Sequence, residues 1–353
     1  MKLFYVTNIP TPYRQFRFEL LSKELESVGV ELVVHYMGKS EPGRFWDVDT
    51  ASSPFKVVHW RSLKLTRGND VYYLWSFEMF KLIYRYSQHD GLMVIGGYYS
   101  PALWLLLLIG SKNRKILSLE SNLNSEKNSG LIARSFKRFL LSCAQRFQVT
   151  GESQKEYVRD ISAKPRDFIV LPNIVNELPF TPQNRNDKVV FISARLIPIK
   201  GLVEFCEALK GKGYSIRIAG SGQLYNELSA FDFVTCLGQL NESQMQHEYL
   251  TCGIFALPSL EDPSPLSAIE SLRYGCYTIL SSRVGNTKDI FSEDSNYVFN
   301  VKSVKSINKV IDHYEELSMD QRNFIRHTNQ GIYNNRFESG LVISNYVSNL
   351  FST

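Results

Sequence analysis

Short apolar segments alternate with amphipathic segments along most of the chain, and this alternation limits the fold more than any other feature. MKLFYVTN at the N-terminus is typical of a buried strand, and RQFRFELLSKELESV at 14–28 has its apolar residues at helical spacing. The same order recurs later, for example where KVVFISAR is followed by GLVEFCEAL. Helices between successive strands predict parallel sheets in a doubly wound α/β fold.

The alternation is interrupted at IVLPNIVNELPFTPQNRNDK, residues 169–188, where prolines, asparagines and charges cluster. This composition is typical of a linker, and 353 residues suffice for about two domains. We predict a Rossmann-like domain over 1–170, a linker over 171–187 and a second such domain over 188–330. A C-terminal helix over 331–353 is expected to cross back to the first domain, and the two domains would face a central cleft.

Cysteine usage and charge argue against several classes of protein. The five cysteines include no CxxC pair, which indicates neither a disulfide framework nor a zinc site and fits a reducing compartment. A net charge of +5 requires no nucleic acid, and RNA-binding motifs are absent from the sequence. The N-terminus lacks the features of a signal peptide, and PALWLLLLIG at 101–110 is too short to span a bilayer. We expect a cytoplasmic protein.

Ligands of open α/β sheets bind at the carboxyl ends of the strands, so the turns that follow strands deserve the closest reading. In SARLIPIKGLVEF, Arg195 ends a strand and Lys200 precedes a helix, and two cations at one turn suit a diphosphate. In IAGSGQLYNEL, Gly220 and Gly222 flank Ser221 and allow a ligand to approach the backbone at a helix start. Taken singly, the first motif is also compatible with a solvated loop and the second with a tight turn.

A third turn lies in LPSLEDPSPLSAIESLRYGC, residues 257–276. We expect Ser264 to cap a helix whose first residue is Pro265 and which Gly275 ends. Asp262 and Glu270 would then border the crevice, where ionised acids accept hydrogen bonds from ribose or sugar hydroxyls. The alternative is that Asp262 caps the helix and Glu270 is an exposed surface acid.

These three turns, in this order, resemble the nucleotide-binding half of the GT-B glycosyltransferases, specifically the retaining family 4 (group 1). The family pattern is G-R-L-x-x-x-K-G, then G-x-G, then P-S-x-x-E-P-F-G-L-x-x-x-E-A-x-x-x-G. This chain reads S-A-R-L-I-P-I-K-G, A-G-S-G and P-S-L-E-D-P-S-P-L-S-A-I-E-S-L-R-Y-G, and its VLPNIVN is similar to a linker V-x-P-N-G-V-D. The resemblance is strong over 170–290 and holds only in outline for the N-terminal half.

The resemblance implies a role for each matching position. Arg195 and Lys200 would hold the donor diphosphate, Glu270 would bind the ribose, and Asp262 would contact the donor sugar. The segment around Ser264, Leu266 and Ser267 would face phosphate or sugar through its backbone amides. Two departures stand out: Asp262 is one methylene shorter than the usual glutamate, and Pro265 has no N–H to donate.

The N-terminal half offers weaker candidates. Contacts with donor or acceptor are expected from two turns, NIPTPYRQF and IGGYYSP, through Tyr13, Arg14, Gly96, Gly97 and Tyr98. Glu120 in LSLESN occupies the turn where many members have a sugar-contacting histidine, and we take it as a catalytic candidate. The alternatives are packing and solvent contacts for the two turns, and a capping or surface acid for Glu120.

Two further patterns bear on metals and membranes. WDVDT, residues 46–50, contains a D-x-D pair, but it lacks a fitting context, and Arg195 with Lys200 would make a metal unnecessary. No cofactor is expected. The helix expected over 130–147 has Ile132, Phe136 and Phe139 on one face and basic residues elsewhere, which suits either an anionic membrane surface or a solvated face.

These expectations combine into one functional hypothesis. The chain would be a GT-B glycosyltransferase that moves a sugar from a nucleoside-diphosphate sugar to a hydroxyl of a glycan acceptor, with retention. The resemblance implies surface-polysaccharide synthesis (O-antigen, capsule or exopolysaccharide), with a lipid-linked acceptor and a peripheral position on the inner face of the cytoplasmic membrane. The alternatives are a nucleotide-sugar 2-epimerase on the same fold and a non-catalytic sugar-nucleotide-binding protein.

Overall fold

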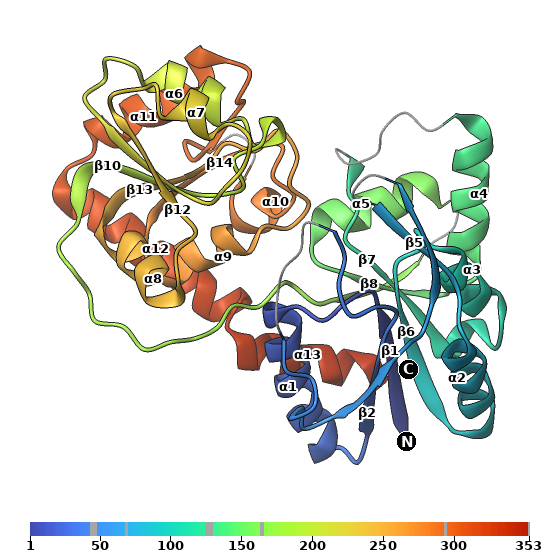
Figure 1. The fold of residues 1–353 in the computed structure, drawn as a ribbon. Coiled ribbons are helices and arrows are strands. Elements are labelled where there is room, and N and C mark those ends of the chain that lie inside the picture. The colour runs from blue at the N-terminus through green and yellow to red at the C-terminus, as the bar shows by residue number, and fades with distance from the viewer. Residues whose placement is uncertain (43–47, 68–69, 124–129, 163–165, 293–294, 352–353) are drawn as a thin grey trace.

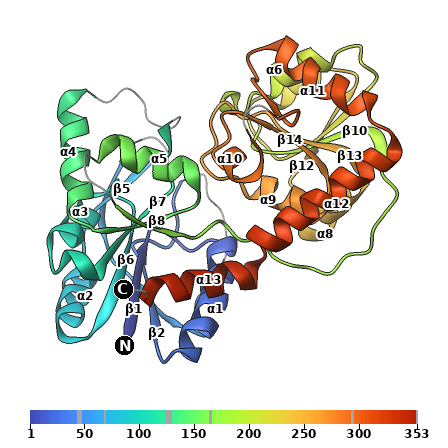
Figure 2. The same ribbon diagram turned by 180° about the vertical axis from the view of Figure 1, so that it is seen from behind.

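The computed structural model describes residues 1–42, 48–67, 70–123, 130–162, 166–292 and 295–351. Two parallel sheets, each with helices on both faces, form two domains that lie side by side (Figures 1 and 2). The α/β fold class predicted from the alternation of strands and helices is confirmed. Within the described part of the chain, no helix combines the length and apolar character that a bilayer span requires.

The N-terminal sheet has the strand order β3-β2-β1-β6-β7-β8-β9. Its strands are β1 (Lys2–Thr7), β2 (Glu31–Tyr36), β3 (Lys56–His59), β6 (Gly91–Gly96), β7 (Lys115–Leu119), β8 (Arg146–Val149) and β9 (Asp167–Val170). The helices are α1 (Pro12–Ser27), α2 (Phe77–Gln88), α3 (Pro101–Leu108), α4 (Leu131–Ser142) and α5 (Glu152–Ile161), with a 3₁₀ turn at Lys112–Arg114. A separate antiparallel hairpin pairs β4 (Leu63–Arg67) with β5 (Asp70–Trp75).

Strand β1 shows why both faces of this sheet are covered. Its side chains alternate, so Phe4 and Val6 pack in the core beneath α2 and α3, whereas Leu3 and Tyr5 pack in the core beneath α1. Every residue of β1 after Lys2 is buried. Such continuous burial is typical of central strands in parallel sheets.

The C-terminal sheet has the order β12-β11-β10-β13-β14-β15. Its strands are β10 (Asn186–Ser193), β11 (Ser215–Ala219), β12 (Val234–Gly238), β13 (Cys252–Leu257), β14 (Tyr277–Ser281) and β15 (Val298–Phe299). The helices are α6 (Leu202–Leu209), α7 (Tyr225–Leu228), α8 (Glu242–Thr251), α9 (Leu266–Arg273), α10 (Thr287–Ile290), α11 (Val304–Glu316) and α12 (Met319–Arg336), with a 3₁₀ turn at Pro198–Lys200.

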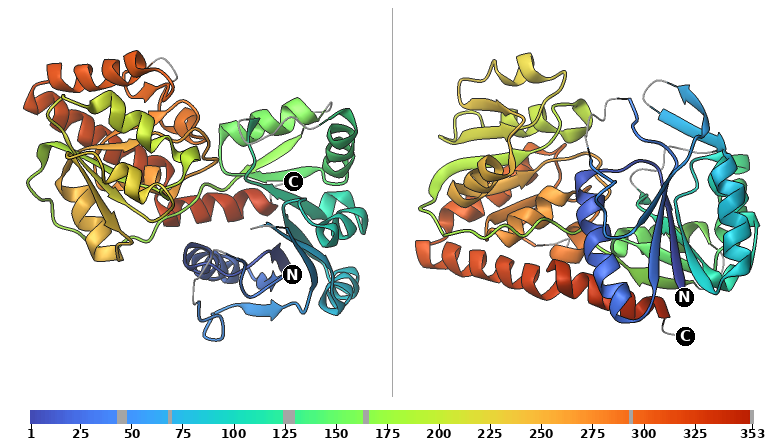
Figure 3. Two further views of the ribbon diagram at one scale, coloured as in Figure 1. Left: turned by 45° about the horizontal axis from the view of Figure 1, so that its top comes forward. Right: turned by 60° about the horizontal axis from the view of Figure 1, so that its bottom comes forward.

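The last helix, α13 (Ser339–Phe351), lies against α1 and β9 of the N-terminal domain. Figure 3 shows α12 and α13 running from one domain to the other beneath both. The Tyr346 hydroxyl donates to Gln148 Oε1 of β8 at 2.5 Å, and Arg146 Nη1 donates to the carbonyl of Leu350 at 2.6 Å. The chain therefore crosses between the domains twice, once at 171–185 and once between α12 and α13.

Two helix boundaries differ from those predicted. Helix α9 begins at Leu266 with Pro265 as its N-cap, so the prediction that Ser264 caps the helix is wrong. The end is right: Gly275 has a left-handed φ of 61°, and the amide of Cys276 donates to the Ser271 carbonyl at 2.9 Å. The helix predicted over 130–147 is α4 and ends at Ser142, because Arg146–Val149 joins the sheet as β8.

Candidate active site between the domains

Lys200 and Asp262 lie together at the carboxyl edge of the C-terminal sheet. Lys200 Nζ is 2.5 Å from Asp262 Oδ2, and the two side chains are only 10% and 18% exposed. The turn at 197–200 is joined to the segment before Asp262 by a hydrogen bond from the Leu260 amide to the Ile199 carbonyl at 2.9 Å. Lys200 and Asp262, which belong to two separately predicted motifs, thus form one ion pair.

Arg195 lies at the end of β10 and is exposed. The turn at 220–222 packs against the backbone on either side of Arg195, and this needs glycine. A Cβ at Gly220 would lie 2.0 Å from the Ala194 carbonyl oxygen, and a Cβ at Gly222 would lie 2.3 Å from the Leu196 carbonyl oxygen. These glycines therefore hold the 220–222 turn against the backbone that carries Arg195. Ser221 lies on the same turn, and its hydroxyl accepts a hydrogen bond from Gln239 at 3.3 Å.

The loop from Asp262 to Pro265 is held in place through its own backbone carbonyls, which accept hydrogen bonds from neighbouring segments. Asn173 of the linker donates to the Ser264 carbonyl at 2.9 Å, and its amide also lies 3.2 Å from the Ser264 hydroxyl. Asn286 donates to the Pro265 carbonyl at 3.2 Å, and the Gly285 amide donates to the Asp262 carbonyl at 2.7 Å. Ser264 therefore fixes the loop to the linker.

Helix α9 continues from this loop into the domain. The backbone amides of its first turn, which includes Leu266 and Ser267, have no acceptors within the helix, as at any helix start. Pro265 directly precedes the first residue of α9 and has no N–H group, so it adds no hydrogen-bond donor at the helix start. The helix start therefore presents fewer amides than the resembled pattern, but still carries the partial positive charge that favours phosphate.

Glu270 lies one turn inside α9, next to a cavity of about 130 Å³ that Asn176, Leu178 and Glu242 also line. The Tyr249 hydroxyl donates to Glu270 Oε2 at 2.7 Å. Burial raises the pKa of the Glu270 carboxyl, and the hydrogen bond from Tyr249 opposes that rise. Glu270 is not the exposed surface acid of the alternative reading, and one carboxyl oxygen is left for another donor.

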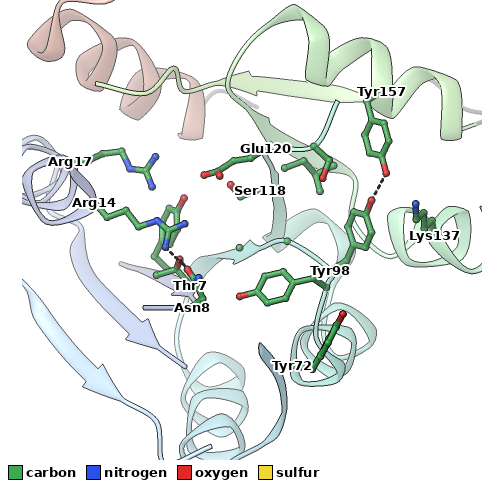
Figure 4. A pocket seen from close by; sticks show the side chains of 16 residues that line it. Thr7, Asn8, Arg14, Arg17, Tyr72, Tyr98, Ser118, Glu120, Lys137 and Tyr157 are labelled. Carbon is green, nitrogen blue, oxygen red and sulfur yellow. Dashed lines mark hydrogen bonds between the residues drawn. The ribbon is translucent and has the colours of Figure 1, made fainter. Parts of the chain in front are cut away.

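The N-terminal domain has a cavity of about 650 Å³ at the carboxyl ends of β1, β6 and β7. Gly96 and Gly97 are among its lining residues, as are Tyr98 and Glu120, the latter directly after β7 (Figure 4). The hydroxyls of Tyr98 and Tyr157 are hydrogen-bonded to each other across the cavity. Tyr13 lies outside this lining, next to the Arg14 guanidinium, which is 5.8 Å from its ring centroid.

Arg14 and Arg17 extend from α1 into the same cavity (Figure 4). Arg14 donates to Asn8 Oδ1 and, at 3.2 Å, to the Ile9 carbonyl. Burial lowers the pKa of Arg14, but the neighbouring Tyr13 and Glu120 outweigh it and leave that pKa raised. The guanidinium is therefore fully charged.

One side chain links the two domains at this place. Gln154 of α5 donates to the carbonyl of Pro263 at 2.9 Å and, over a long 3.5 Å, to the carbonyl of Glu120. Ser153 donates to the Gly285 carbonyl, and the Glu152 amide donates to Asp289 Oδ1 at 3.0 Å. These contacts place the Asp262 loop of the second domain next to the Glu120 end of the first domain's cavity.

The remaining sequence predictions fall elsewhere. Asp47 of the D-x-D pair is outside the described residues, and Asp49 is exposed and accepts from the Ala51 amide at 2.9 Å in a local turn. On α4, the basic residues are engaged by α5: Arg134 pairs with Asp160 at 2.9 Å, and Arg138 donates to the Ile161 carbonyl at 3.0 Å. These two arginines therefore do not form a free basic face.

Sequence reasoning missed several residues of this site, chiefly Arg17, Gln154, Asn173 and Gly285. Arg17 follows Arg14 by three residues, a spacing that puts two side chains on one helix face, and this signal was available. Each of the other three makes a contact that is distant in sequence: Gln154 with Pro263, Asn173 with Ser264, and Gly285 with Ser153. No local pattern predicts such contacts.

Comparisons with known proteins agree with this geometry. Residues 176–330 match the family model described as Glycosyl transferases group 1. Sucrose-phosphate synthase from Thermosynechococcus elongatus has a similar structure, with a TM-score of 0.74 and 14% identity over 99% of both chains. HepE from Anabaena, solved with UDP and glucose, has a TM-score of 0.72 and 12% identity over 100% of both chains.

A third similar structure is the pneumococcal O-GlcNAc transferase GtfA in complex with UDP and GlcNAc, with a TM-score of 0.66 and 10% identity over 99% of this chain and 98% of that one. No curated sequence matches the chain. At these identities the structural likeness shows the shared two-domain GT-B fold.

Proposed function

The chain is a glycosyltransferase with a group 1 domain at residues 176–330, and we propose that it moves a sugar from a nucleoside-diphosphate donor to a hydroxyl of a glycan. The observation that carries the proposal is the Lys200–Asp262 pair, which lies beside the start of α9 with Arg195 on the neighbouring turn. UDP is the first nucleotide to test, because similar structures were solved with UDP.

Lys200 and Arg195 would bind the diphosphate. An ammonium has three N–H donors, and one is directed at Asp262, which leaves two for phosphate oxygens. Arg195 is exposed and its side chain makes no hydrogen bond or ion pair with the described residues, so its planar fork is available for a second pair of phosphate oxygens. Together they would offset the negative charge that develops on the leaving diphosphate.

The carboxylates would bind hydroxyls of the donor. Asp262 has one carboxyl oxygen on Lys200, and the other is proposed to accept a hydroxyl of the transferred sugar. Glu270 accepts from Tyr249 with one oxygen and is proposed to accept a ribose hydroxyl with the other. The short Asp262 side chain is compensated by its direct pairing with Lys200, which fixes the carboxylate in place.

The acceptor would enter from the N-terminal cavity, which Gly97 and Tyr98 line and where Gln154 joins the Glu120 backbone to the Asp262 loop. The acceptor oxygen would form the new bond to the anomeric carbon while the bond from that carbon to the diphosphate oxygen breaks. With retention, the departing phosphate oxygen would take the acceptor's proton. Glu120 would orient the acceptor hydroxyl in this scheme.

A donor panel tests this proposal. UDP-, GDP- and dTDP-sugars are incubated with the protein, with and without glycan acceptors, and nucleoside diphosphate release is followed in buffer containing EDTA. We expect release that depends on acceptor, survives the chelator and falls at least about tenfold in Arg195→Ala. Conversion of the sugar without acceptor would indicate epimerisation, and binding without turnover would indicate a non-catalytic protein.

We further propose that the acceptor is lipid-linked and belongs to surface-polysaccharide assembly, and that the protein rests on the membrane surface. The support is a set of exposed apolar side chains on α4, among which Leu131 and Ile132 at the helix start are 86% and 88% exposed. Exposed apolar side chains gathered on one helix are typical of membrane-contacting surfaces. Phe139 of the same helix is half exposed and adds to this apolar surface.

A further inference from the structure

Arg17 is a buried cation whose side chain has no partner of opposite charge among the described residues. The residue is only 4% exposed, and its side chain forms no hydrogen bond or ion pair with any of them. Its Nε is fully enclosed without an acceptor, and its guanidinium is directed into the cavity at the end of β1 (Figure 4). Arg14 is 9% exposed, and among the residues that the structure describes its side chain bonds only to neutral oxygens of Asn8 and Ile9, while its Nε finds no acceptor.

Burying an unpaired charge is costly, because the charge loses its hydration without gaining a counter-charge. Glu120 is the one acid among the described residues that line the cavity; it is exposed and acts on Arg14 without an ion pair. The Glu41 carboxylate accepts a hydrogen bond from the Asn8 amide at 3.0 Å, and Asn8 Oδ1 in turn accepts from Arg14. The arginines therefore exceed the acids in the cavity and keep donors free for a ligand.

The surroundings of the two arginines favour a sugar as the ligand that carries an anionic group. Tyr72, Tyr98 and Tyr157 present rings and hydroxyls to the cavity, and Ser118 lies beside the arginines (Figure 4). Aromatic faces pack against sugar rings, and hydroxyls exchange hydrogen bonds with theirs. Gln148 fixes Ser118 and Tyr5 by hydrogen bonds of 2.8 Å each, so the floor of the cavity is rigid.

We propose that this cavity binds an acceptor sugar with a compact oxyanion, a carboxylate or a phosphate, gripped by Arg17 and Arg14. A guanidinium matches either group with two parallel hydrogen bonds. The proposal rests on the proposed function in that the bound sugar is the acceptor. The donor diphosphate has its own cations, Arg195 and Lys200, in the other domain.

Three probes with the same ring separate the possibilities. Glucose, glucuronate and glucose 6-phosphate carry a hydroxyl, a carboxylate and a phosphate on the same carbon. Their affinities are measured by calorimetry for the wild type, Arg17→Gln, Arg17→Lys and Lys23→Gln, a control on the exposed side of the same helix. UDP affinity and the melting temperature are measured for each protein.

We expect one anionic probe to bind at least about tenfold more tightly than glucose, and its identity tells carboxylate from phosphate. Arg17→Gln should lose this preference, Arg17→Lys should keep part of it, and Lys23→Gln should keep all of it. UDP affinity should not change. The melting temperature of Arg17→Gln should not fall, because an unpaired buried charge is removed.

Three results would each overturn the inference. These are equal affinities for the three probes, an anion preference that survives Arg17→Gln, or a loss of UDP affinity in that variant, which would assign the arginines to the donor. A lower melting temperature together with unchanged probe binding would show a purely structural role. If UDP binds normally while the anionic probes show no preference, the proposed transferase function stands and only this inference fails.

Discussion

At the scale of single residues, Glu270 shows how burial sets the chemistry of a site. Its pKa is raised by burial, so the carboxyl takes up a proton at a higher pH than an exposed glutamate does. Only the ionised form accepts hydrogen bonds with both oxygens, one from Tyr249 and one from a ribose hydroxyl. Donor affinity should therefore weaken as the pH falls through this raised pKa.

The measurement is the affinity for UDP-glucose from pH 5 to pH 8, in the wild type and in Glu270→Gln. The wild type should bind more weakly at the acidic end, and Glu270→Gln should bind about tenfold more weakly at neutral pH with a flatter profile. The diphosphate diester of this ligand does not titrate in that range, so a difference in profile belongs to the protein. Parallel profiles would contradict the role of Glu270.

Residue positions were predictable where a motif carries them, and contacts were not. Arg195, Lys200, Asp262 and Glu270 lie in motifs at turns that follow strands, and their expected roles come from the resemblance to the group 1 pattern. That Lys200 and Asp262 form an ion pair depends on the register between two turns separated by 62 residues, and no local pattern encodes it. The unpaired state of Arg17 is likewise a property of the folded cavity.

At the scale of elements, the Asp262 loop depends on a glycine in a different segment. A Cβ at Gly285 would lie 1.8 Å from the Pro263 carbonyl oxygen and 2.9 Å from Asn122 Nδ2, across the domain contact. Gly285→Ala must displace the loop, so we expect turnover to fall about tenfold or more, with a melting temperature lowered by a few degrees. Steady-state kinetics and thermal unfolding check this.

Gly331→Ala is the matched control, because a Cβ at Gly331 meets nothing within 4 Å. Gly331 lies inside α12, where alanine is favoured over glycine by up to about 1 kcal/mol. Turnover should be unchanged and the melting temperature equal or higher. Equal behaviour of the two variants would show that the Asp262 loop tolerates displacement.

The element boundaries show what patterning misses. The alternation predicted the strands of the C-terminal sheet well, because buried strands such as β13 are continuously apolar. Strand β4 is exposed along its whole length, so burial imposes no apolar run on its sequence. The start of α9 was misplaced because Ser264 suits an N-cap in sequence, but in the fold its oxygens accept from Asn173 instead.

At the scale of the whole molecule, Asp289 connects the domains and responds to pH. Burial raises its pKa from 3.8 to about 6, and the Glu152 amide of the other domain donates to it at 3.0 Å. The native state thus holds this proton more tightly than the unfolded state does. The stability that Asp289 contributes is full below about pH 4 and is lost as the pH rises to about 6.

Asparagine does not titrate, so Asp289→Asn removes this pH-dependent loss of stability. Its side-chain oxygen can still accept the hydrogen bond from the Glu152 amide. The melting temperature of the variant relative to the wild type should therefore rise between pH 4.5 and pH 7.5. A shift of about two pKa units corresponds to a change in stability of at most about 3 kcal/mol. Because the side chain is partly exposed, the expected change is smaller than this limit. A difference that stays constant with pH would exclude a titrating Asp289.

The outer face of the N-terminal domain carries the proposed membrane contact. Leu131→Ser with Ile132→Ser should reduce flotation with lipid vesicles several-fold, because two exposed apolar side chains are removed. Since Arg134 and Arg138 are bound to α5, anionic lipid should add little over neutral lipid. Phe324→Ser, at a 72% exposed position of the other domain, should float like the wild type. Unchanged flotation of the double variant would contradict this surface.

The central claim is that Arg195 and Lys200 hold the diphosphate of the donor. Calorimetric titration of UDP into the wild type, Arg195→Ala and Lys200→Ala tests it most directly, with the exposed Lys302→Ala as the control. Loss of a charge-assisted contact predicts an affinity about 10- to 100-fold weaker in each of the two variants and an unchanged affinity in the control. Affinities equal to that of the wild type in both variants would contradict the assignment of the donor site.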